Sequence, residues 1–303
     1  MTDVPFTYSR TAKQRYVFVN EEPPTLDTRV NLAHLDSFFN LTMTFRSDSD
    51  IVWPYGYFES KEHMNKDEPK DKEINYARGK TKLVAWFVSN CESESLREKY
   101  VENLQKYVTV DIYGKCGDHV CWAGDQEDCY SMLEKDYKFY LSFENAFCRD
   151  YVTEKFFQLM DRRIIPIVYG AANYSSIAPE HSYIDATKMG AKKLAELLKT
   201  IDADDNLYNE FFAWKPKYKV IKDRRTIARN SFCRFCQLLH EDTVSNWRNY
   251  DNFQGWWNRE NHCHSSGIFS TPFKSFSFHE VDVTEFQPKN NNSLKLKEPI
   301  SEL

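Results

Sequence analysis

Glycine is scarce in this chain. Only nine of the 303 residues are glycine, and no Gly-x-Gly-x-x-Gly or Walker-type run occurs. Such runs let backbone amides surround the phosphates of a nucleotide. If the protein binds a nucleotide, side chains and helix termini must hold the pyrophosphate instead.

Long apolar runs and an excess of positive charge are missing as well. No segment approaches the roughly 18 apolar residues of a membrane-spanning helix, and residues 1–10 lack the apolar centre of a signal peptide. We therefore expect a soluble chain. The formal net charge of −5 argues against nucleic acid as the main partner.

The composition is otherwise that of a globular protein, and its length favours two domains. Hydrophobic residues make up 41% of the chain and aromatic residues 16%, which is enough to form real cores. The eight cysteines are even in number and partly clustered, which favours disulfides in an oxidising compartment. Sequons at Asn40, Asn173 and Asn291 also suit a secretory compartment.

Residues 80–214 show the alternation of strands and helices that is typical of a Rossmann-like domain. The expected strands are 82–88, 108–112, 137–143 and 164–168, and the expected helices are 95–106, 152–163 and 191–201. A strand–helix–strand unit of this kind has parallel strands and a right-handed crossover. The predicted fold class is therefore α/β.

The segments on either side of this domain have weaker patterns. The expected elements are short strands at 14–20, 41–45 and 51–53, a weak helix at 32–39 and a charged linker over 59–80. Residues 1–79 are too few for a complete α/β lobe. We therefore expect residues 215–303 to pack back on them and supply helices, with a disordered polar tail beyond about residue 287.

One segment, Tyr137 to Gly170, carries most of the functional information. It predicts a buried strand, a polar loop, a helix and a second strand. Polar side chains gather where the first strand ends and the helix begins: Glu144, Asn145, Arg149, Asp150, Tyr151, Glu154 and Lys155. Ligands of open α/β sheets bind at that edge, and helix N-termini there favour anions.

This segment resembles the donor-binding motif of the α1,3-fucosyltransferases, which form glycosyltransferase family 10. The motif runs Tyr-Lys-Phe-x-x-x-Phe-Glu-Asn and then Tyr-Val-Thr-Glu-Lys, and both halves stand here at the family spacing. The resemblance covers roughly residues 14–240. It implies a GT-B type fold with two Rossmann-like lobes: a GDP-fucose-binding lobe at 80–214 and an acceptor lobe, here incomplete, within 1–79.

Family members also carry a Golgi membrane anchor and a stem, and neither is visible in this sequence. We therefore expect a member that lacks the N-terminal part of the family plan. The resemblance implies work in the Golgi lumen, normally as a type II membrane protein held by an anchor that this sequence does not contain.

Glu22 is the candidate catalytic base. The segment Asn20-Glu21-Glu22-Pro23-Pro24 follows a predicted strand and is similar to the family's Asn-x-Glu-Ser-Pro, in which the glutamate is the proposed base. Proline replaces the serine here, and the neighbouring Glu21 remains an alternative. Two exposed loop carboxylates without a function are the other interpretation.

Lys155 and Arg97 are the candidate ligands of a departing diphosphate. Arg97 follows Val88-Ser89-Asn90, which matches the family's Val-Ser-Asn and its downstream arginine. Charge-assisted hydrogen bonds from both cations suit a leaving pyrophosphate, although a lone lysine or arginine usually belongs to a solvated helix surface. The resemblance also implies donor-binding positions for Ser89, Asn90, Asn145, Tyr151 and Glu154.

Arg46 belongs to a second motif. Residues 40–50, followed by Pro54-Tyr55-Gly56, are similar to the family's Tyr-Arg-Arg-Asp-Ser-Asp and Pro-Tyr-Gly, with Phe45 and Ser47 as departures. Arg46 and Asp48 are therefore expected on the donor side or between the lobes. An acidic surface turn is the alternative.

The C-terminal cysteines leave two interpretations open. Cys233, Cys236 and His240, completed by Cys263 with His262 or His264, offer ligands for zinc. The family resemblance implies disulfides instead, or free thiols where partners are missing. No Asp-x-Asp metal motif follows a strand at the donor site, so no metal should be required, and Mn²⁺ would at most help product release.

Taken with the resemblance, these residues predict an inverting glycosyltransferase that moves L-fucose from GDP-fucose to O3 of GlcNAc. The run Lys115-Cys116-Gly117, with Cys121 and Cys129, is most similar to the core-type branch, which acts on the innermost GlcNAc of N-glycans. A Lewis-type enzyme is one alternative. A non-catalytic homologue that only binds the nucleotide sugar is the other.

Overall fold

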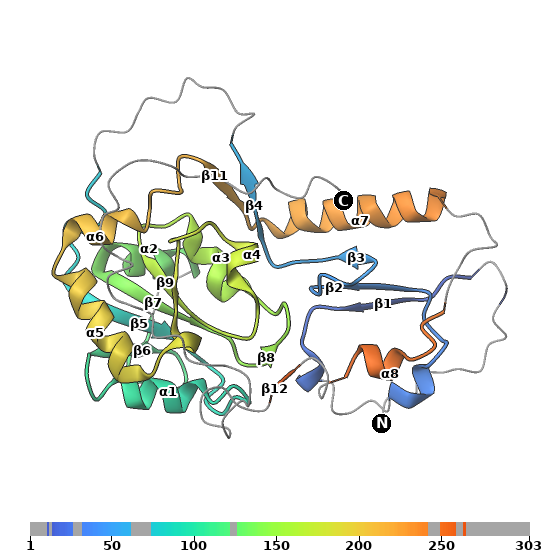
Figure 1. Cartoon of the computed structure of the whole chain (residues 1–303), viewed down its shortest axis with the longest axis horizontal. Helices are drawn as coiled ribbons and strands as arrows, with labels where there is room; N and C mark the ends of the chain where they lie inside the picture. Colours follow the sequence, from blue (N-terminus) through green and yellow to red (C-terminus); the bar gives the residue numbers. More distant parts are fainter. Residues whose placement is uncertain are drawn as a thin grey trace. The chain divides into compact units, whose positions relative to one another are not determined.

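The computed structural model describes residues 11, 14–26, 32–61, 74–121, 126–241, 249–258 and 263–264. All of them belong to one compact unit, residues 1–273. Its described part contains a five-stranded parallel sheet, a three-stranded parallel sheet and two short antiparallel strand pairs (Figure 1). The predicted α/β fold class is confirmed.

The larger sheet consists of β5 (Lys82–Phe87), β6 (Val110–Tyr113), β7 (Tyr137–Phe143), β9 (Ile165–Tyr169) and β10 (Ile184–Asp185). Its spatial order is β10-β9-β7-β5-β6, and all neighbours are parallel. Counted along the chain this is the 2-1-3-4-5 order, in which the direction of winding reverses between β5 and β7. Ligands of such sheets bind beyond the carboxyl ends of the strands at that reversal.

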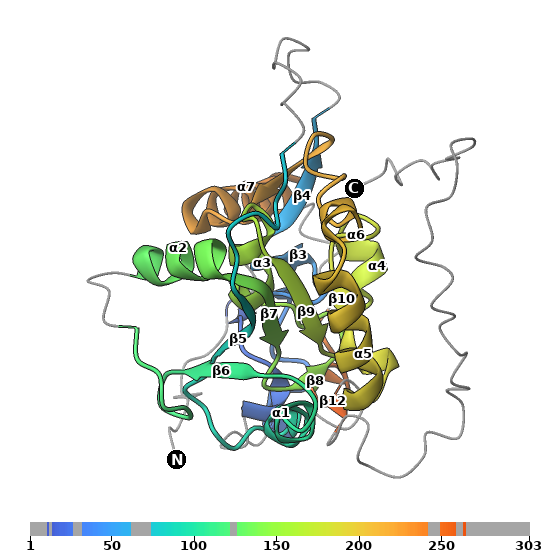
Figure 2. The same cartoon turned by 90° about the vertical axis from the view of Figure 1, so that its left-hand side faces the viewer.

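Helices cover both faces of this sheet (Figure 2). On one face lie α2 (Gln126–Asp136) and α3 (Glu154–Met160), whose Leu133 and Leu159 share a core cluster. On the other face α1 (Arg97–Leu104) packs against α5 (Ala191–Asp202). Because both faces are covered, all seven residues of β7 are buried.

The smaller sheet consists of β1 (Val17–Asn20), β2 (Leu41–Thr44) and β3 (Ile51–Val52). Two helices from the C-terminal part of the chain lie on opposite sides of it (Figure 1). The first, α7 (Arg224–Glu241), packs through Phe235 and Leu238 on the side that bears Met43. The second, α8 (Phe253–Trp256), packs through Phe253 on Phe18.

Some elements differ from the sequence predictions. Glu59 and Ser60, predicted to begin a linker, end strand β4 (Tyr57–Ser60), which pairs with β11 (Tyr218–Ile221). The weak helix predicted at 32–39 is the short 3₁₀ helix η2 (Leu32–Leu35). The remaining elements are η1 (Pro24–Leu26), β8 (Phe147–Cys148), α4 (Tyr174–Ile177), η3 (Ala186–Lys188), α6 (Asp205–Glu210) and β12 (Cys263–His264).

Three disulfides link Cys91 to Cys116, Cys121 to Cys129 and Cys148 to Cys263. Because Cys263 is bonded to Cys148, it cannot complete a zinc site, and the zinc interpretation is wrong in that respect. Cys233 and Cys236 are exposed free thiols. The tail predicted to be disordered lies outside the described residues, and within those residues no helix has the length and apolar character of a membrane span.

Candidate active site

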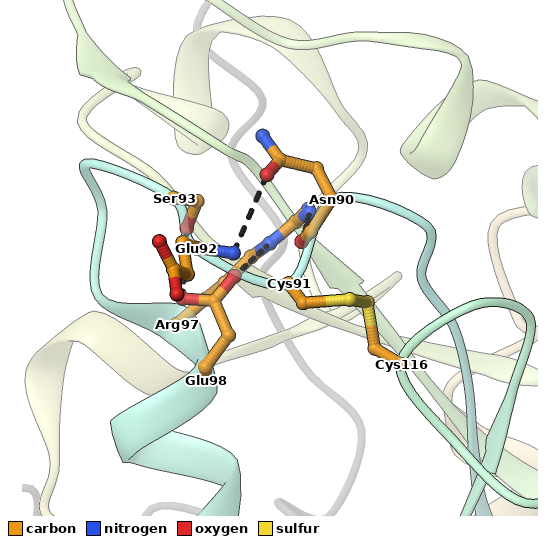
Figure 3. The surroundings of a disulfide bond; sticks show 7 residues. All are labelled: Asn90, Cys91, Glu92, Ser93, Arg97, Glu98 and Cys116. Carbon is orange, nitrogen blue, oxygen red and sulfur yellow. Dashed lines mark hydrogen bonds and ion pairs between the residues drawn. A yellow bond between two sulfur atoms is a disulfide. The ribbon is translucent and has the colours of Figure 1, made fainter.

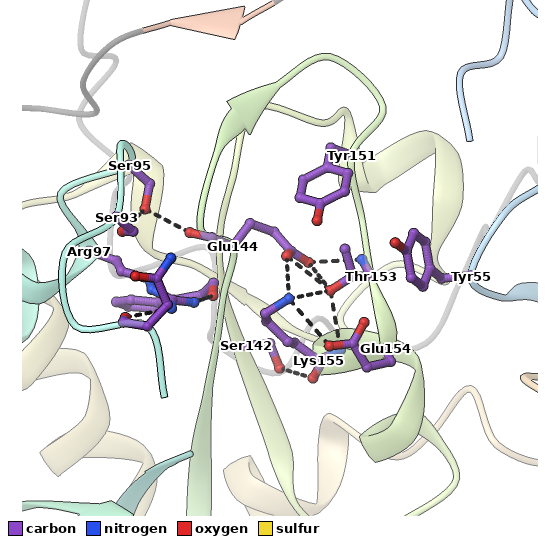
Figure 4. Close-up of polar contacts among 12 residues, drawn as sticks. Tyr55, Ser93, Ser95, Arg97, Ser142, Glu144, Tyr151, Thr153, Glu154 and Lys155 are labelled. Atoms are coloured by element: carbon purple, nitrogen blue, oxygen red, sulfur yellow. Dashed lines mark hydrogen bonds and ion pairs between the residues drawn. The ribbon is translucent and has the colours of Figure 1, made fainter. Parts of the chain in front are cut away.

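Glu144 lies at the centre of a buried polar cluster beyond the carboxyl end of β7 (Figure 4). Its side chain is fully buried. Its carboxylate accepts hydrogen bonds from the backbone N–H of Thr153 at 2.8 Å and from the Thr153 hydroxyl at 3.0 and 3.1 Å. Thr153 is also the N-cap of α3. The cluster therefore joins the end of β7 to the start of α3.

Lys155 brings a positive charge to this cluster. Its Nζ lies 3.2 Å from Glu144 Oε2, 2.8 Å from Thr153 Oγ1 and 3.3 Å from Glu154 Oε1. Burial lowers the pKa of Lys155, but the charges of Glu144 and Glu154 outweigh this effect and raise it. Burial raises the pKa of Glu144, and the nearby Lys155 charge offsets only part of that rise. Lys155 therefore stays cationic at the strand edge.

Arg97 is buried under the ends of β5 and β7, with 3% of its surface exposed. Its Nη1 donates to the Phe143 carbonyl at 2.7 Å, and its Nη2 donates to the Asn90 carbonyl at 3.1 Å. These bonds tie the loop after β5 to the last residue of β7. Together with the bond from Nε to Glu98, these bonds use three of the five N–H groups of the Arg97 guanidinium.

Ser89 and Asn90 are exposed beyond the carboxyl end of β5. The side chain of Asn90 accepts a hydrogen bond from the Glu92 backbone at 3.4 Å. The Cys91–Cys116 disulfide fastens this loop to the loop after β6 (Figure 3). Both predicted residues therefore stand on a tethered loop next to the winding reversal of the sheet.

The smaller sheet contributes Glu22, which is exposed and follows β1. The hydroxyl of Tyr151 donates to Glu22 Oε2 at 3.2 Å. Burial raises the pKa of Tyr151, and the nearby carboxylate of Glu144 adds to the rise, so the hydroxyl remains a neutral donor. Tyr151 stands four residues before Lys155. The structure thus brings Glu22 from one sheet to the segment of the other sheet that carries the cation.

The neighbouring Glu21 has different partners. Its carboxylate forms an ion pair with Arg224 on α7, and its carbonyl accepts a hydrogen bond from the Tyr55 hydroxyl at 2.9 Å. Because its carboxylate is paired with Arg224 and its carbonyl is hydrogen-bonded, Glu21 is not placed as a free base. Of the two glutamates, Glu22 is the one in contact with Tyr151.

Arg46 contacts residues that lie near the smaller sheet. It is 1% exposed, binds Asp48 through two bonds of 2.6 and 2.8 Å, and lies over the Trp256 ring at 4.3 Å. The adjacent Ser47 hydroxyl donates to Asp150, beyond β8, at 2.7 Å. This loop therefore links the ends of the two sheets, and the contacts of Arg46 help to hold it in place.

Two polar atoms near this edge are buried without a hydrogen-bond partner among the described residues: Asn145 Oδ1 and the Tyr174 hydroxyl. A Cβ atom placed on Gly170, just after β9, would stand 2.8 Å from that hydroxyl and 3.4 Å from Glu144 Cγ. Buried polar atoms are almost always hydrogen-bonded in folded proteins. Both atoms are therefore candidate contacts for a ligand.

Sequence reasoning names Glu144 only as one of the polar residues at the strand edge, and it assigns no role to Thr153 or Tyr174. For Thr153 a signal exists, because a threonine directly before a helix is a common N-cap. The full burial of Glu144 and the unpaired hydroxyl of Tyr174 depend on how α3 and α4 pack against the strand ends. No local pattern in the sequence reports that packing.

Comparison with known proteins places the whole arrangement in one family. The sequence profile described as "Glycosyltransferase family 10 (fucosyltransferase) C-term" matches residues 77–256, and the profile "Fucosyltransferase, N-terminal" matches residues 1–56. The chain belongs to glycosyltransferase family 10. The resemblance carried by residues 137–170 is thereby confirmed.

Two curated relatives in family 10 come from Drosophila melanogaster. Alpha-(1,3)-fucosyltransferase C is 40% identical over 269 residues, which is 84% of this chain and 61% of the relative. Glycoprotein 3-alpha-L-fucosyltransferase A is 42% identical over 229 residues, which is 74% of this chain and 44% of the relative. The chain thus spans about half of the length of these family 10 relatives.

A solved structure shares the fold. The crystal structure of an alpha1,3-fucosyltransferase with GDP-fucose superposes with a TM-score of 0.53 at 16% identity, over 77% of each chain. This likeness, together with the two parallel sheets, confirms the GT-B type of fold that the family 10 resemblance implies.

Proposed function

We propose that this family 10 chain is an inverting α1,3-fucosyltransferase that moves L-fucose from GDP-fucose to a GlcNAc residue of glycoprotein N-glycans. The hydrogen bond between Tyr151 and Glu22 is the observation that carries the proposal. It joins an exposed carboxylate to the strand edge that bears the Lys155 cation. Fucosyl transfer needs these two groups, a base for the acceptor and a cation for the leaving diphosphate.

In this reaction Glu22 takes the proton of the acceptor 3-hydroxyl. The acceptor oxygen attacks C1 of fucose from the face opposite the nucleotide. The bond between C1 and the β-phosphate oxygen breaks, and its electron pair leaves with GDP. Lys155 stabilises the charge that develops on the diphosphate, and Glu154 stabilises the positive charge on the sugar ring. Attack opposite the leaving group inverts the configuration at C1.

The other predicted donor residues take supporting roles in this proposal. Ser89 and Asn90 contact the nucleotide from the loop after β5. Asn145 accepts a hydrogen bond from the nucleotide sugar through its buried Oδ1. Arg97 adds positive charge beneath the diphosphate and fixes the loop that carries Asn90. Arg46 supports the loop that connects the two sheet ends.

The acceptor is assigned to the core type on two grounds. The run Lys115-Cys116-Gly117 is similar to that of the core-type branch, and its cysteine forms the disulfide that fastens the loop after β5. In addition, the 42% identical relative is named a glycoprotein 3-alpha-L-fucosyltransferase.

A transfer assay separates this proposal from its alternatives. Oxidised protein is incubated with GDP-fucose and either a core N-glycopeptide or N-acetyllactosamine, and GDP release is measured. Turnover with the glycopeptide and little with the disaccharide is the expected result. The reverse preference indicates a Lewis-type enzyme. Binding of GDP without turnover on either acceptor indicates a non-catalytic homologue.

We infer that this transfer requires no metal ion, because Lys155 supplies the positive charge that the leaving diphosphate needs. Activity should therefore persist in excess EDTA, and Mn²⁺ should raise the rate only modestly by speeding GDP release. Complete loss of turnover in EDTA, with recovery on addition of Mn²⁺, would contradict this inference.

We also infer that the protein works in the Golgi lumen. The three disulfides and the exposed sequon at Asn173 support passage through an oxidising secretory compartment. Asn40, in contrast, is 7% exposed. Its side-chain amide accepts a hydrogen bond from the Tyr16 backbone N–H and donates one to the Asn249 side chain. Site mapping by mass spectrometry after secretory expression should find glycan at Asn173 and none at Asn40, and unmodified Asn173 would count against luminal passage.

A further inference from the structure

Glu144 places a buried negative charge beside the proposed site of a negatively charged ligand. A carboxylate near a diphosphate repels it, and burial of the charge carries a cost of its own. The side chain nevertheless has no exposed surface. The contact of Glu144 with Lys155 offers a reason for a buried negative charge at this position.

The ammonium group of Lys155 has three hydrogens to donate, and three oxygen atoms lie around it. Two of them belong to Glu144, at 3.2 Å, and Thr153, at 2.8 Å, and both of these residues are fully buried. The third belongs to Glu154, at 3.3 Å, whose side chain is 48% exposed. The Glu154 contact is therefore the one that a ligand oxygen can most easily replace.

Glu144 is itself held from several sides. Its backbone N–H donates to the Tyr169 carbonyl at 3.0 Å, and its own carbonyl accepts a bond from the Ser95 hydroxyl at 2.7 Å. Its carboxylate is fixed by both the N–H and the hydroxyl of Thr153. The anchor of Lys155 is thus fastened to β9, to the residues before α1 and to the start of α3.

We propose that Glu144 is a positioning residue: together with Thr153 it holds two of the three N–H groups of Lys155, so that the third is presented to the diphosphate of the nucleotide. This inference rests on the proposed function, because it requires that Lys155 bind the diphosphate. Replacement of Glu154 by a phosphate oxygen then needs no movement of the Lys155 chain. A donor fixed in advance loses little freedom when the ligand arrives.

A double-mutant cycle tests the proposal. Glu144→Gln keeps the size of the side chain and removes its charge. Calorimetric titration should show GDP binding about tenfold weaker or more in this variant, the effect of losing a hydrogen bond to a charged group. In a Lys155→Met background the same substitution should change GDP affinity by less than about twofold, because its effect passes through Lys155.

Guanosine provides the ligand control, since it lacks the diphosphate. Its affinity should be the same for the wild-type protein and for Glu144→Gln. Unchanged or tighter GDP binding by folded Glu144→Gln, as simple repulsion predicts, would overturn the proposal. An equal loss of GDP affinity in the Lys155→Met background would overturn it as well, because Glu144 would then act independently of Lys155.

Thr153 offers a second pair of variants should Glu144→Gln fail to fold. Thr153→Val removes the hydroxyl and should weaken GDP binding several-fold, whereas Thr153→Ser keeps it and should stay within about twofold of the wild type. Equal affinities for the two variants would contradict the proposal. Failure of the proposed function has a different signature, in which the wild type binds no GDP or Lys155→Met binds it as tightly as the wild type does.

Discussion

The adjacent residues Glu21 and Glu22 have different side-chain partners, and this difference separates their proposed roles. The carboxylate of Glu21 forms an ion pair with Arg224, and its carbonyl accepts a hydrogen bond from Tyr55. Glu22 is exposed. Within the described residues, the one hydrogen bond that its carboxylate accepts comes from the uncharged hydroxyl of Tyr151. A general base must be free to accept a proton, so we assign the proposed role of base to Glu22 rather than to Glu21.

Substitution of Glu22 tests this assignment. Glu22→Gln should lower kcat on the order of 10²- to 10⁴-fold, because a glutamine cannot take the proton of the acceptor hydroxyl. GDP affinity should stay within about twofold, since the residue does not bind the diphosphate. Rates of GDP release and calorimetry provide the two numbers. The matched control is Glu21→Gln, and a loss of kcat as large as that of Glu22→Gln would contradict the assignment.

At this scale the sequence predicts residue positions better than residue contacts. Lys155, Glu154 and Tyr151 could be placed together because they follow a buried strand and begin a helix. That Arg97 points inward to the Phe143 carbonyl could not be predicted. Its direction is decided by the packing of α1 on the sheet rather than by any neighbour in the sequence.

A polar network joins three strands of the larger sheet away from the candidate site. Asp111 on β6 accepts hydrogen bonds from Tyr137 at the start of β7, at 2.5 Å, and from Lys82 at the start of β5, at 3.0 Å. Burial tends to raise the pKa of Asp111, but these two hydrogen bonds, together with the charges of Lys82 and His119, outweigh it and lower the pKa below the usual value of 3.8.

This network predicts a pH-dependent stability. The unfolded chain takes up a proton at Asp111 at a higher pH than the folded chain does, so the stabilisation is complete above the usual pKa and is lost as pH falls through the lowered one. Asp111→Asn should reduce the free energy of unfolding by roughly 1–3 kcal/mol near pH 7. Urea titrations of both proteins should show the difference shrinking toward pH ~3, and a constant difference would contradict this account.

Element prediction succeeds or fails for physical reasons. Strands β5, β7 and β9 are buried on both faces and therefore read as apolar runs in the sequence. Strands β4 and β11 are half exposed, contain charged residues and pair across a long separation along the chain. Their pairing is stabilised by the packing of Phe58 against Trp214, which no local pattern contains.

For the whole molecule, the disulfides differ in how much of the chain they constrain. Cys148–Cys263 closes a separation of 115 residues, whereas Cys121–Cys129 closes a separation of 8. In the chain-entropy model these loops correspond to about 4.8 and 2.5 kcal/mol of stabilisation. The long bridge also fastens β12 to β8, beside the Tyr151 segment.

Removal of each bridge tests this difference. The double variant Cys148→Ala with Cys263→Ala should lose about 2 kcal/mol more stability than Cys121→Ala with Cys129→Ala. Guanidinium unfolding without reductant gives both values. A larger loss from the short bridge would show that local packing, rather than loop length, determines the contribution of the disulfides.

The architecture as a whole is only partly contained in sequence patterns. The shortage of strands before residue 80 indicates that other segments must complete the smaller lobe. It does not indicate that α7 and α8 cover opposite sides of one sheet, because that depends on which apolar face each helix presents. The order of the larger sheet likewise emerges only from strand pairing.

The most direct test of the account is the crystal structure of this chain in complex with GDP. The account predicts the nucleotide beyond the carboxyl ends of β5 and β7, with Lys155 Nζ about 3 Å from a diphosphate oxygen. A nucleotide bound elsewhere, or a diphosphate that Lys155 does not touch, would contradict it.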